Sequence, residues 1–172
     1  DGLAAAMARS AAEAVVRLPG PETSRAFLTV LTEALLLSGL AMSVAGSSRP
    51  CSGACHEISH AIDLTCPFRT SMHGDQVLVG AAFATLLRGD QDTFDLLLAA
   101  SARFGLALLP EDLGVSDTEF AHAVEIAPST RPGRHTILEE LRLNRADATQ
   151  VLGGYRDKVR SACESNQSVE MV

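Results

Sequence analysis

Apolar residues recur along the chain at helical spacing, and polar breaks divide the pattern into separate segments. Two segments are apolar on nearly every side, one over residues 22–45 and one over residues 73–87. A helix that is apolar all round is expected to be buried in the middle of its domain. No segment alternates at period two in the manner of a half-buried strand. The pattern therefore predicts an all-α protein, a helical bundle of about seven to nine helices.

Shorter segments complete the helical pattern. We expect further helices over residues 3–18, 53–64, 92–104, 120–126 and 144–161, and a short one after Pro110. Gly105 is a plausible helix cap, since glycine tolerates the left-handed conformation. Ser116 with Glu119 three residues later forms the capping-box pattern of a helix start. The length predicts one compact helical domain over residues 1–164, and the residues from 165 to 172 read as a polar tail.

Composition and charge narrow the classes of function. The 172 residues are 47% hydrophobic and carry a net charge of −7, with Lys158 as the one lysine. Without a basic stripe to bind phosphates, we expect no nucleic-acid partner. The apolar segment from 26 to 45 contains Glu33 and several hydroxyls, which favours a core helix over membrane insertion. The start lacks the pattern of a secretory signal and the four cysteines read as reduced thiols, so we expect a cytoplasmic protein.

The candidate chemistry lies between the two most apolar segments, in residues 46–80. Three of the five histidines are found there, at His56, His60 and His73. The first two are spaced i, i+4 and would share one face of a helix, while His73 would open the next helix. The positive end of a helix disfavours a protonated imidazole, and a metal ligand has to be neutral. The three histidines are therefore either a metal site or ordinary polar residues at helix ends.

A second metal hypothesis uses cysteines. Cys51, Cys55, His56 and His60 could supply the four ligands of a closed structural zinc site. Such sites usually separate their two ligand pairs by about a dozen residues. Here all four lie within ten residues, which would strain the site.

Three blocks of the sequence occur in order: SGLAMSVAGSSRPCSGACHEISHAID at 38–63, HGDQVLVG at 73–80 and TRPGRHTIL at 130–138. Together they resemble the glycerol-1-phosphate dehydrogenases. That family belongs to a superfamily with the iron/zinc alcohol dehydrogenases, the glycerol dehydrogenases and the dehydroquinate synthases. The resemblance extends over essentially the whole chain, but only over the C-terminal half of such an enzyme.

The resemblance implies an all-helical C-terminal domain that holds a divalent metal beside an N-terminal α/β domain that binds NAD(P). In the family one aspartate and two histidines bind the metal, and the histidines match His56 and His73. His60 matches a histidine near the substrate, which implies a catalytic role in relaying or orienting a proton. The aspartate, the nucleotide-binding domain and most cofactor-binding residues would lie upstream of Asp1, so this chain alone is expected to be inactive. Relatives often carry an acid at the position of Cys55.

We therefore expect the metal- and substrate-binding domain of an NAD(P)-dependent polyol-phosphate dehydrogenase. Zinc is the first choice of metal, with iron and nickel as others, and it would stabilise the substrate alkoxide during hydride transfer. Arg131 and Arg134 could hold the phosphate of a small polyol or ketone. Ser47, Ser48 and Arg49 could line the cleft. The arginines could equally be solvated, and the serines a simple turn.

Two other functions stay open. A metal-dependent cyclase of the dehydroquinate-synthase type would use a similar metal site, although the TRPGRHTIL block argues against it. A helical metal-binding or interaction module without catalysis would explain the missing nucleotide-binding domain. That domain could also belong to a separate partner chain, and the protein could form a homo-oligomer.

Overall fold

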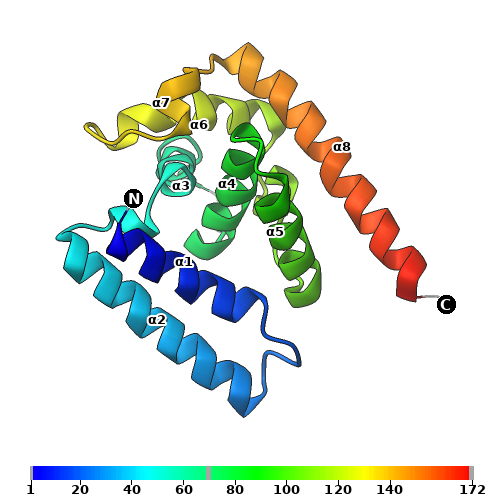
Figure 1. Cartoon of the computed structure of the whole chain (residues 1–172). Helices are drawn as coiled ribbons and strands as arrows, with labels where there is room; N and C mark the ends of the chain where they lie inside the picture. Colours follow the sequence, from blue (N-terminus) through cyan, green and yellow to red (C-terminus); the bar gives the residue numbers. More distant parts are fainter. Residues whose placement is uncertain (1, 69–70, 171–172) are drawn as a thin grey trace. The chain divides into compact units, whose positions relative to one another are not determined.

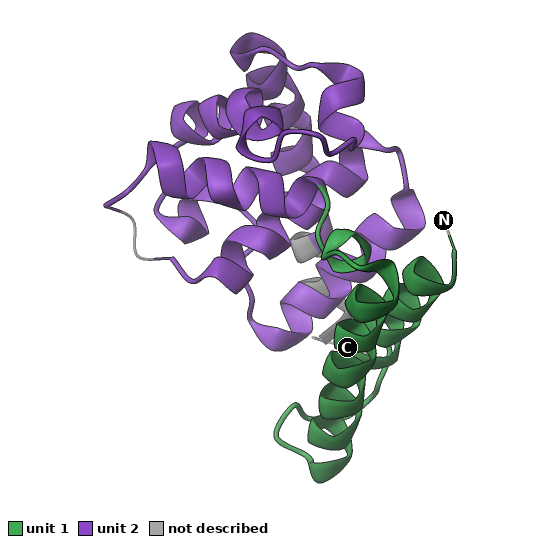
Figure 2. Ribbon diagram, turned by 90° about the vertical axis from the view of Figure 1, so that its left-hand side faces the viewer, with its two compact units in different colours: residues 1–53 green, residues 54–172 purple. Residues whose placement is uncertain are grey.

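A computed structural model of the chain describes residues 2–68 and 71–170, with side chains through residue 162. Over these residues it contains eight α-helices, two short 3-10 helices and no strand (Figure 1). The prediction of an all-α protein is confirmed. The chain divides into two compact units, Asp1–Gly53 and Ala54–Val172 (Figure 2).

The first unit is a helical hairpin. Helices α1 (Leu3–Val16) and α2 (Arg25–Ala45) pack on one another, and the 3-10 helix η1 (Arg49–Cys51) contacts both. The Ser24 side chain caps the start of α2, and Gly46 ends it at a φ of 62°. A residue in this left-handed conformation is a common way to end a helix, and glycine adopts it without a steric penalty.

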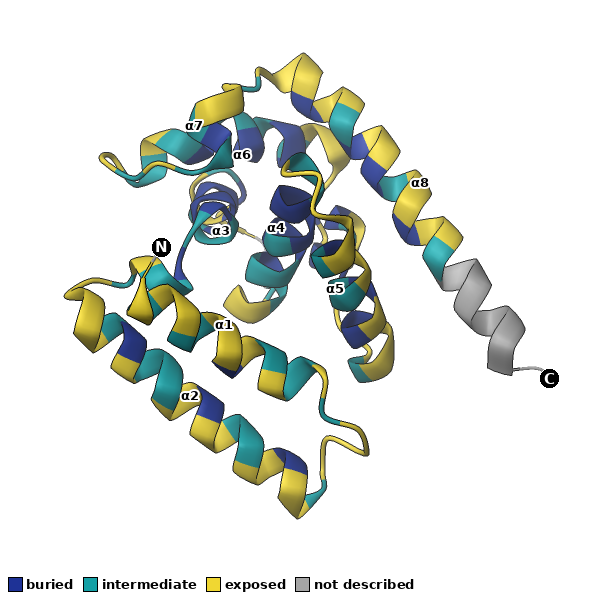
Figure 3. Ribbon diagram, viewed as in Figure 1, coloured by how far each residue is buried: buried dark blue, intermediate teal, exposed yellow. Residues whose placement is uncertain are grey.

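Helix α2 is less buried than its apolar pattern predicts. Its buried residues are Phe27, Ala34 and Ala41. Five large apolar side chains are exposed: Leu28, Leu35, Leu36, Leu40 and Val44. Exposed positions accordingly recur along the length of α2 in Figure 3. The prediction of a central core helix is therefore wrong, because the described part of this unit offers α2 two neighbours, α1 and η1. By length and composition α2 could cross a membrane, a test that core helices of soluble proteins and signal sequences also pass.

The second unit holds the main apolar core. Its elements are α3 (Ala54–Thr65), α4 (His73–Leu87), α5 (Gln91–Phe104), η2 (Pro110–Leu113), α6 (Asp117–Thr130), α7 (Ile137–Leu141) and α8 (Arg145–Glu170). The sequence predicted α3, α4 and α5 to within a residue at each end. Helix α8 continues to Glu170, beyond the predicted end at 161 and into the predicted tail. No proline or glycine interrupts the chain after Gly154, so nothing in the backbone stops this helix.

Two predicted capping signals are confirmed. Gly105 ends α5 in the left-handed conformation at a φ of 61°. At the start of α6, the Ser116 amide donates to the Glu119 carboxylate at 2.8 Å while the Glu119 amide donates to the Ser116 hydroxyl. Both signals are local, which is why the sequence alone could show them.

Four aromatic rings form the centre of this core. Phe83 on α4 lies edge-on to Phe120 on α6 and to Tyr155 on α8, with ring centroids 5.3 and 5.7 Å apart. Phe94 on α5 lies edge-on to Tyr155 at 6.0 Å. The Tyr155 hydroxyl donates to the Leu108 carbonyl, and burial raises the pKa of this tyrosine. These contacts anchor α8 next to Gly153 and Gly154, two adjacent glycines that weaken the helix.

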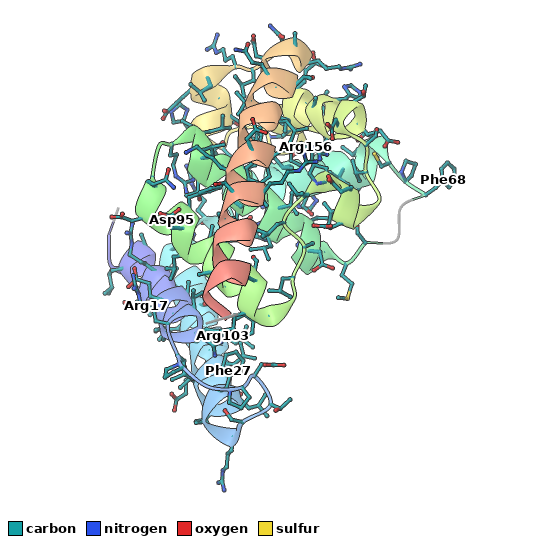
Figure 4. All side chains as sticks on the ribbon, turned by 90° about the vertical axis from the view of Figure 1, so that its right-hand side faces the viewer. Arg17, Phe27, Phe68, Asp95, Arg103 and Arg156 are labelled. Atoms are coloured by element: carbon teal, nitrogen blue, oxygen red, sulfur yellow. The ribbon has the colours of Figure 1, made fainter. Side chains whose placement is uncertain are left out.

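One charged side chain also ties α8 to the rest of the unit. Arg156 extends from α8 (Figure 4). Its guanidinium donates to the carboxylates of Glu111 on η2 and Asp117 on α6. It reaches Glu111 through two nitrogens, each 2.6 Å from a carboxylate oxygen. Such a forked pair fixes geometry better than a single ion pair.

Helices α3 and α4 approach closely at Gly80. A β-carbon placed on Gly80 would lie 2.9 Å from the Cys55 carbonyl oxygen and 3.3 Å from the Ile58 β-carbon. Because any larger residue would collide with the backbone of α3, glycine sets the distance between the two helices. The neighbouring side chains of Ile58, Val79 and Phe83 are fully buried.

We expect Gly80→Ala to destabilise the protein by about 1–3 kcal/mol, the usual cost of an added methyl group in a packed core. Gly153→Ala is the matched control, because a β-carbon there meets nothing within 4 Å on α8. The control should stabilise by about 0.5–1 kcal/mol, since alanine is the better helix former. Urea unfolding of both variants measures the two effects, and equal stability of the variants would contradict a close helix contact at Gly80.

Candidate functional site

Helices α3 and α4 bring the three predicted histidines together. His56 and His60 lie one turn apart on α3, and His73 is the first residue of α4. The His56 and His73 ring centroids are 5.4 Å apart at an interplanar angle of 66°. The His60 and His73 centroids are 6.2 Å apart. The predicted convergence of these rings is thus present, while their roles as ligands stay predictions.

His56 is half-buried and has a thiol as neighbour. The Cys55 sulfur lies 3.2 Å from its Nδ1. Burial, followed by the neighbouring His73 and Arg131, lowers the pKa of His56 to about 4. The ring is therefore neutral at physiological pH, which is the form that binds metals.

His60 contacts the basic loop between α6 and α7. The Arg131 Nη2 atom lies 2.9 Å from its Nε2. A guanidinium can only donate, so Nε2 accepts and the ring proton of neutral His60 is on Nδ1. Burial, followed by the Arg131 charge, lowers the pKa of His60 and favours this neutral form.

His73 is exposed, and one of its ring nitrogens is hydrogen-bonded. The Ser59 hydroxyl lies 2.9 Å from its Nδ1, and the same hydroxyl donates to Gln76 Oε1 at 2.7 Å. The Gln76 amide nitrogen in turn donates to Asp63 at 3.0 Å and to Ser71 at 3.3 Å. A chain of polar groups thus runs through the α3–α4 interface to His73.

The basic loop is attached to α3 at both of its ends. The Thr130 hydroxyl lies 3.4 Å from the Glu57 carbonyl oxygen, and the Thr136 hydroxyl lies 2.9 Å from the Glu57 carboxylate. Glu57 is fully buried, and burial raises its pKa against the opposing effect of the Thr136 hydrogen bond. This glutamate therefore holds the loop against the helix that carries His56 and His60.

The loop borders a small cavity next to the histidines. It has a volume of about 400 Å³ and is lined by His60, Asp63, Leu64, Thr130 and Arg131. Arg131 and Arg134 are both half-buried. The structure thus places one predicted phosphate-binding residue, Arg131, at the mouth of a cavity and in contact with a predicted site histidine.

The remaining predicted substrate contacts lie in the first unit. Ser47, Ser48 and Arg49 form the turn from α2 into η1, and the Arg49 amide lies 3.5 Å from the Ser47 hydroxyl. Their part in substrate binding stays a prediction.

Three buried polar residues were missed by the sequence reasoning: Glu57, Ser59 and Gln76. Glu57 and Ser59 are fully buried, and Gln76 is 3% exposed. The available signal was their position, since all three lie on helices whose other buried residues are apolar apart from Thr85. Buried polar groups are costly unless they are hydrogen-bonded, so their presence in a helix interface indicates a specific task.

The two rings His56 and His73 have a spacing that suits a shared cation. Two imidazoles on one tetrahedral zinc, at the usual Zn–N distance of about 2.0–2.1 Å, would hold their ring centres roughly 5 Å apart. Across the residues with described side chains, no group of three or more His, Cys, Asp or Glu side chains could hold a metal. The alternative of a closed four-ligand site with Cys51, Cys55, His56 and His60 is therefore wrong. His56 and His73 offer a partial ligand set, as an open catalytic site would need with further ligands.

Comparisons with known proteins agree with the predicted resemblance. No protein-family model matches the chain. A glycerol-1-phosphate dehydrogenase [NAD(P)+] of Thermofilum pendens is 43% identical over 123 residues, which is 72% of this chain and 35% of that protein. The enzyme of the same name from Methanosarcina barkeri is 37% identical over 140 residues, which is 78% of this chain and 38% of that protein. The chain thus spans little more than a third of these relatives. Over that part of their length, the chain is similar to the glycerol-1-phosphate dehydrogenases.

Proposed function

We propose that this chain forms the metal- and substrate-binding part of an NAD(P)-dependent polyol-phosphate dehydrogenase. The observation that carries the proposal is the pairing of His56 and His73 at a ring-centroid distance of 5.4 Å. The relatives' names support the reaction class, since they are glycerol-1-phosphate dehydrogenases that use NAD(P)+.

In this proposal, His56 and His73 hold a divalent cation, with zinc as the first choice. When bound, that cation would supply positive charge beside the substrate oxygen while nicotinamide exchanges the hydride. A further ligand would come from the part of the relatives that this chain does not match. The resemblance implies an aspartate there, so the chain by itself should be inactive.

Arg131 and Arg134 would bind the phosphate of the substrate. Arg131 borders the cavity and lies beside the histidines, so a phosphate bound there would place the rest of a small polyol near the cation site. A guanidinium fork recognises phosphate through paired charge-assisted hydrogen bonds. Glu57 would support this role by holding both ends of the loop that carries the two arginines.

His60 would orient Arg131 and relay a proton. Its Nε2 accepts from the guanidinium, so its Nδ1 carries the exchangeable proton. The lowered pKa of His60 keeps the ring neutral at physiological pH, as a group that both accepts and donates a proton has to be.

The proposal predicts that His73→Ala in the full-length protein that contains this chain loses metal and turnover together. The loss of affinity should exceed the roughly 10–100-fold that follows removal of an outer-shell partner, because a direct ligand is removed. Metal content by mass spectrometry and NADH oxidation with dihydroxyacetone phosphate measure the two effects. His122→Ala, a histidine on α6 that contacts Glu125 and Arg145, is the control and should keep both. A His73→Ala protein with bound zinc and normal turnover would contradict the ligand assignment.

The metal-free protein should show an unusual titration at His56. We expect its ring to stay neutral until the pH falls to about 4. In the unfolded chain the ring takes up this proton at about pH 6.5, because that is the ordinary pKa of histidine. The contribution of His56 to stability is therefore complete above about pH 6.5 and is lost as the pH falls toward about 4. NMR titration of the ring protons measures this, and a midpoint near the ordinary histidine value would contradict the described burial.

A further inference from the structure

The polar chain beneath His73 is unusual for a helix interface. Ser59 and Gln76 are buried between α3 and α4, where their neighbours Ile58, Ile62 and Val79 are apolar and fully buried. Three hydrogen bonds of this polar network are 2.7–3.0 Å long. A satisfied polar network in such a place fixes the orientation of each member.

Counting protons gives this network a direction. Asp63 is at the exposed end, and an ionised carboxylate can only accept, so it draws the amide nitrogen of Gln76 toward itself. The carbonyl oxygen of Gln76 must then face Ser59, and it can only accept. The single proton of the Ser59 hydroxyl is therefore donated to Gln76 Oε1, at 2.7 Å.

The same count decides the tautomer of His73. Since the Ser59 hydroxyl has given its proton to Gln76, it offers only a lone pair to the imidazole 2.9 Å away. His73 Nδ1 must carry a proton to make this hydrogen bond, and in the neutral ring Nε2 is then left with a free lone pair. A free lone pair is what a metal ion needs from imidazole.

We propose that Ser59, Gln76 and Asp63 act as positioning residues that fix the Nδ1–H tautomer of His73 and keep its Nε2 ready for the cation. This inference rests on the proposed function, because it assumes that His73 is a ligand. In this proposal none of the three residues would be a ligand of the cation. At the other ring, the Nδ1 neighbour of His56 is the Cys55 thiol, which is a weaker hydrogen-bond partner than a hydroxyl.

The central test is Ser59→Ala in the full-length protein. Removing the acceptor should lower zinc affinity by about 10–100-fold, as is typical for an outer-shell partner of a metal-bound histidine. Ser101→Ala is the matched control: Ser101 is buried on α5, and its hydroxyl has no hydrogen-bond partner among the described residues. Competition titration with zinc measures both affinities, and the control should match the parent protein.

A second pair of variants changes Asp63, at the far end of the network. Because Asp63 is exposed, we expect these substitutions to leave the fold intact. Asp63→Ala removes the group that orients Gln76, so zinc should bind more weakly. Asp63→Asn can accept from the Gln76 amide but can also donate to its carbonyl oxygen, so it no longer sets the orientation of Gln76 and should also bind zinc more weakly than the parent. Zinc binding by Asp63→Asn equal to that of the parent would contradict the role of Asp63 in setting the direction of the network.

The tautomer itself can be observed without metal. In protein labelled with ¹⁵N at histidine, the ring-nitrogen shifts of His73 report which nitrogen carries the proton. We expect protonated Nδ1 in the parent protein and a mixture of the two tautomers in Ser59→Ala. A parent protein with its proton on Nε2 would overturn the inference.

These outcomes separate the inference from the proposed function. If His73→Ala loses zinc while Ser59→Ala binds it like the parent, the positioning network is wrong and the metal site stands. If His73→Ala keeps zinc, the metal site is wrong and the positioning role falls with it.

Discussion

The candidate site depends on the close approach of α3 and α4 at Gly80. This glycine leaves no room for a β-carbon against the Cys55 carbonyl, so the two helices lie backbone against backbone. Cys55 immediately precedes His56, and His73 begins the helix that carries Gly80. The contact therefore fixes the distance between the two proposed ligands. One turn further along α4, Phe83 packs the helix against the rings of Phe120 and Tyr155.

Buried polar groups then give this apolar framework its chemistry. Glu57 holds the arginine loop, while Ser59 and Gln76 connect His73 to Asp63. Each of these groups costs free energy to bury and is retained with a defined partner, which is the pattern expected where geometry must be exact to a few tenths of an ångström. Burial also lowers the pKa of His56 and of His60, so both rings are neutral where a cation and a proton relay would require it.

The sequence predicted the features that depend on local pattern. The bounds of α3, α4 and α5, the Gly105 cap and the Ser116–Glu119 capping box follow from neighbouring residues, and the i, i+4 spacing of His56 and His60 follows from helix geometry. The burial of α2 could not be predicted, because it depends on which other elements surround that helix. The contacts of Glu57 with Thr136 and of His60 with Arg131 join residues more than 70 positions apart, so spacing along the chain could not reveal them.

The most direct test of this account is a crystal structure of the full-length protein grown with zinc and inorganic phosphate. The account predicts one zinc ion bonded at about 2.0–2.1 Å to Nε2 of both His56 and His73. It also predicts a phosphate on Arg131. Zinc bound elsewhere, or bonded to Nδ1 of His73 in place of Nε2, would contradict it.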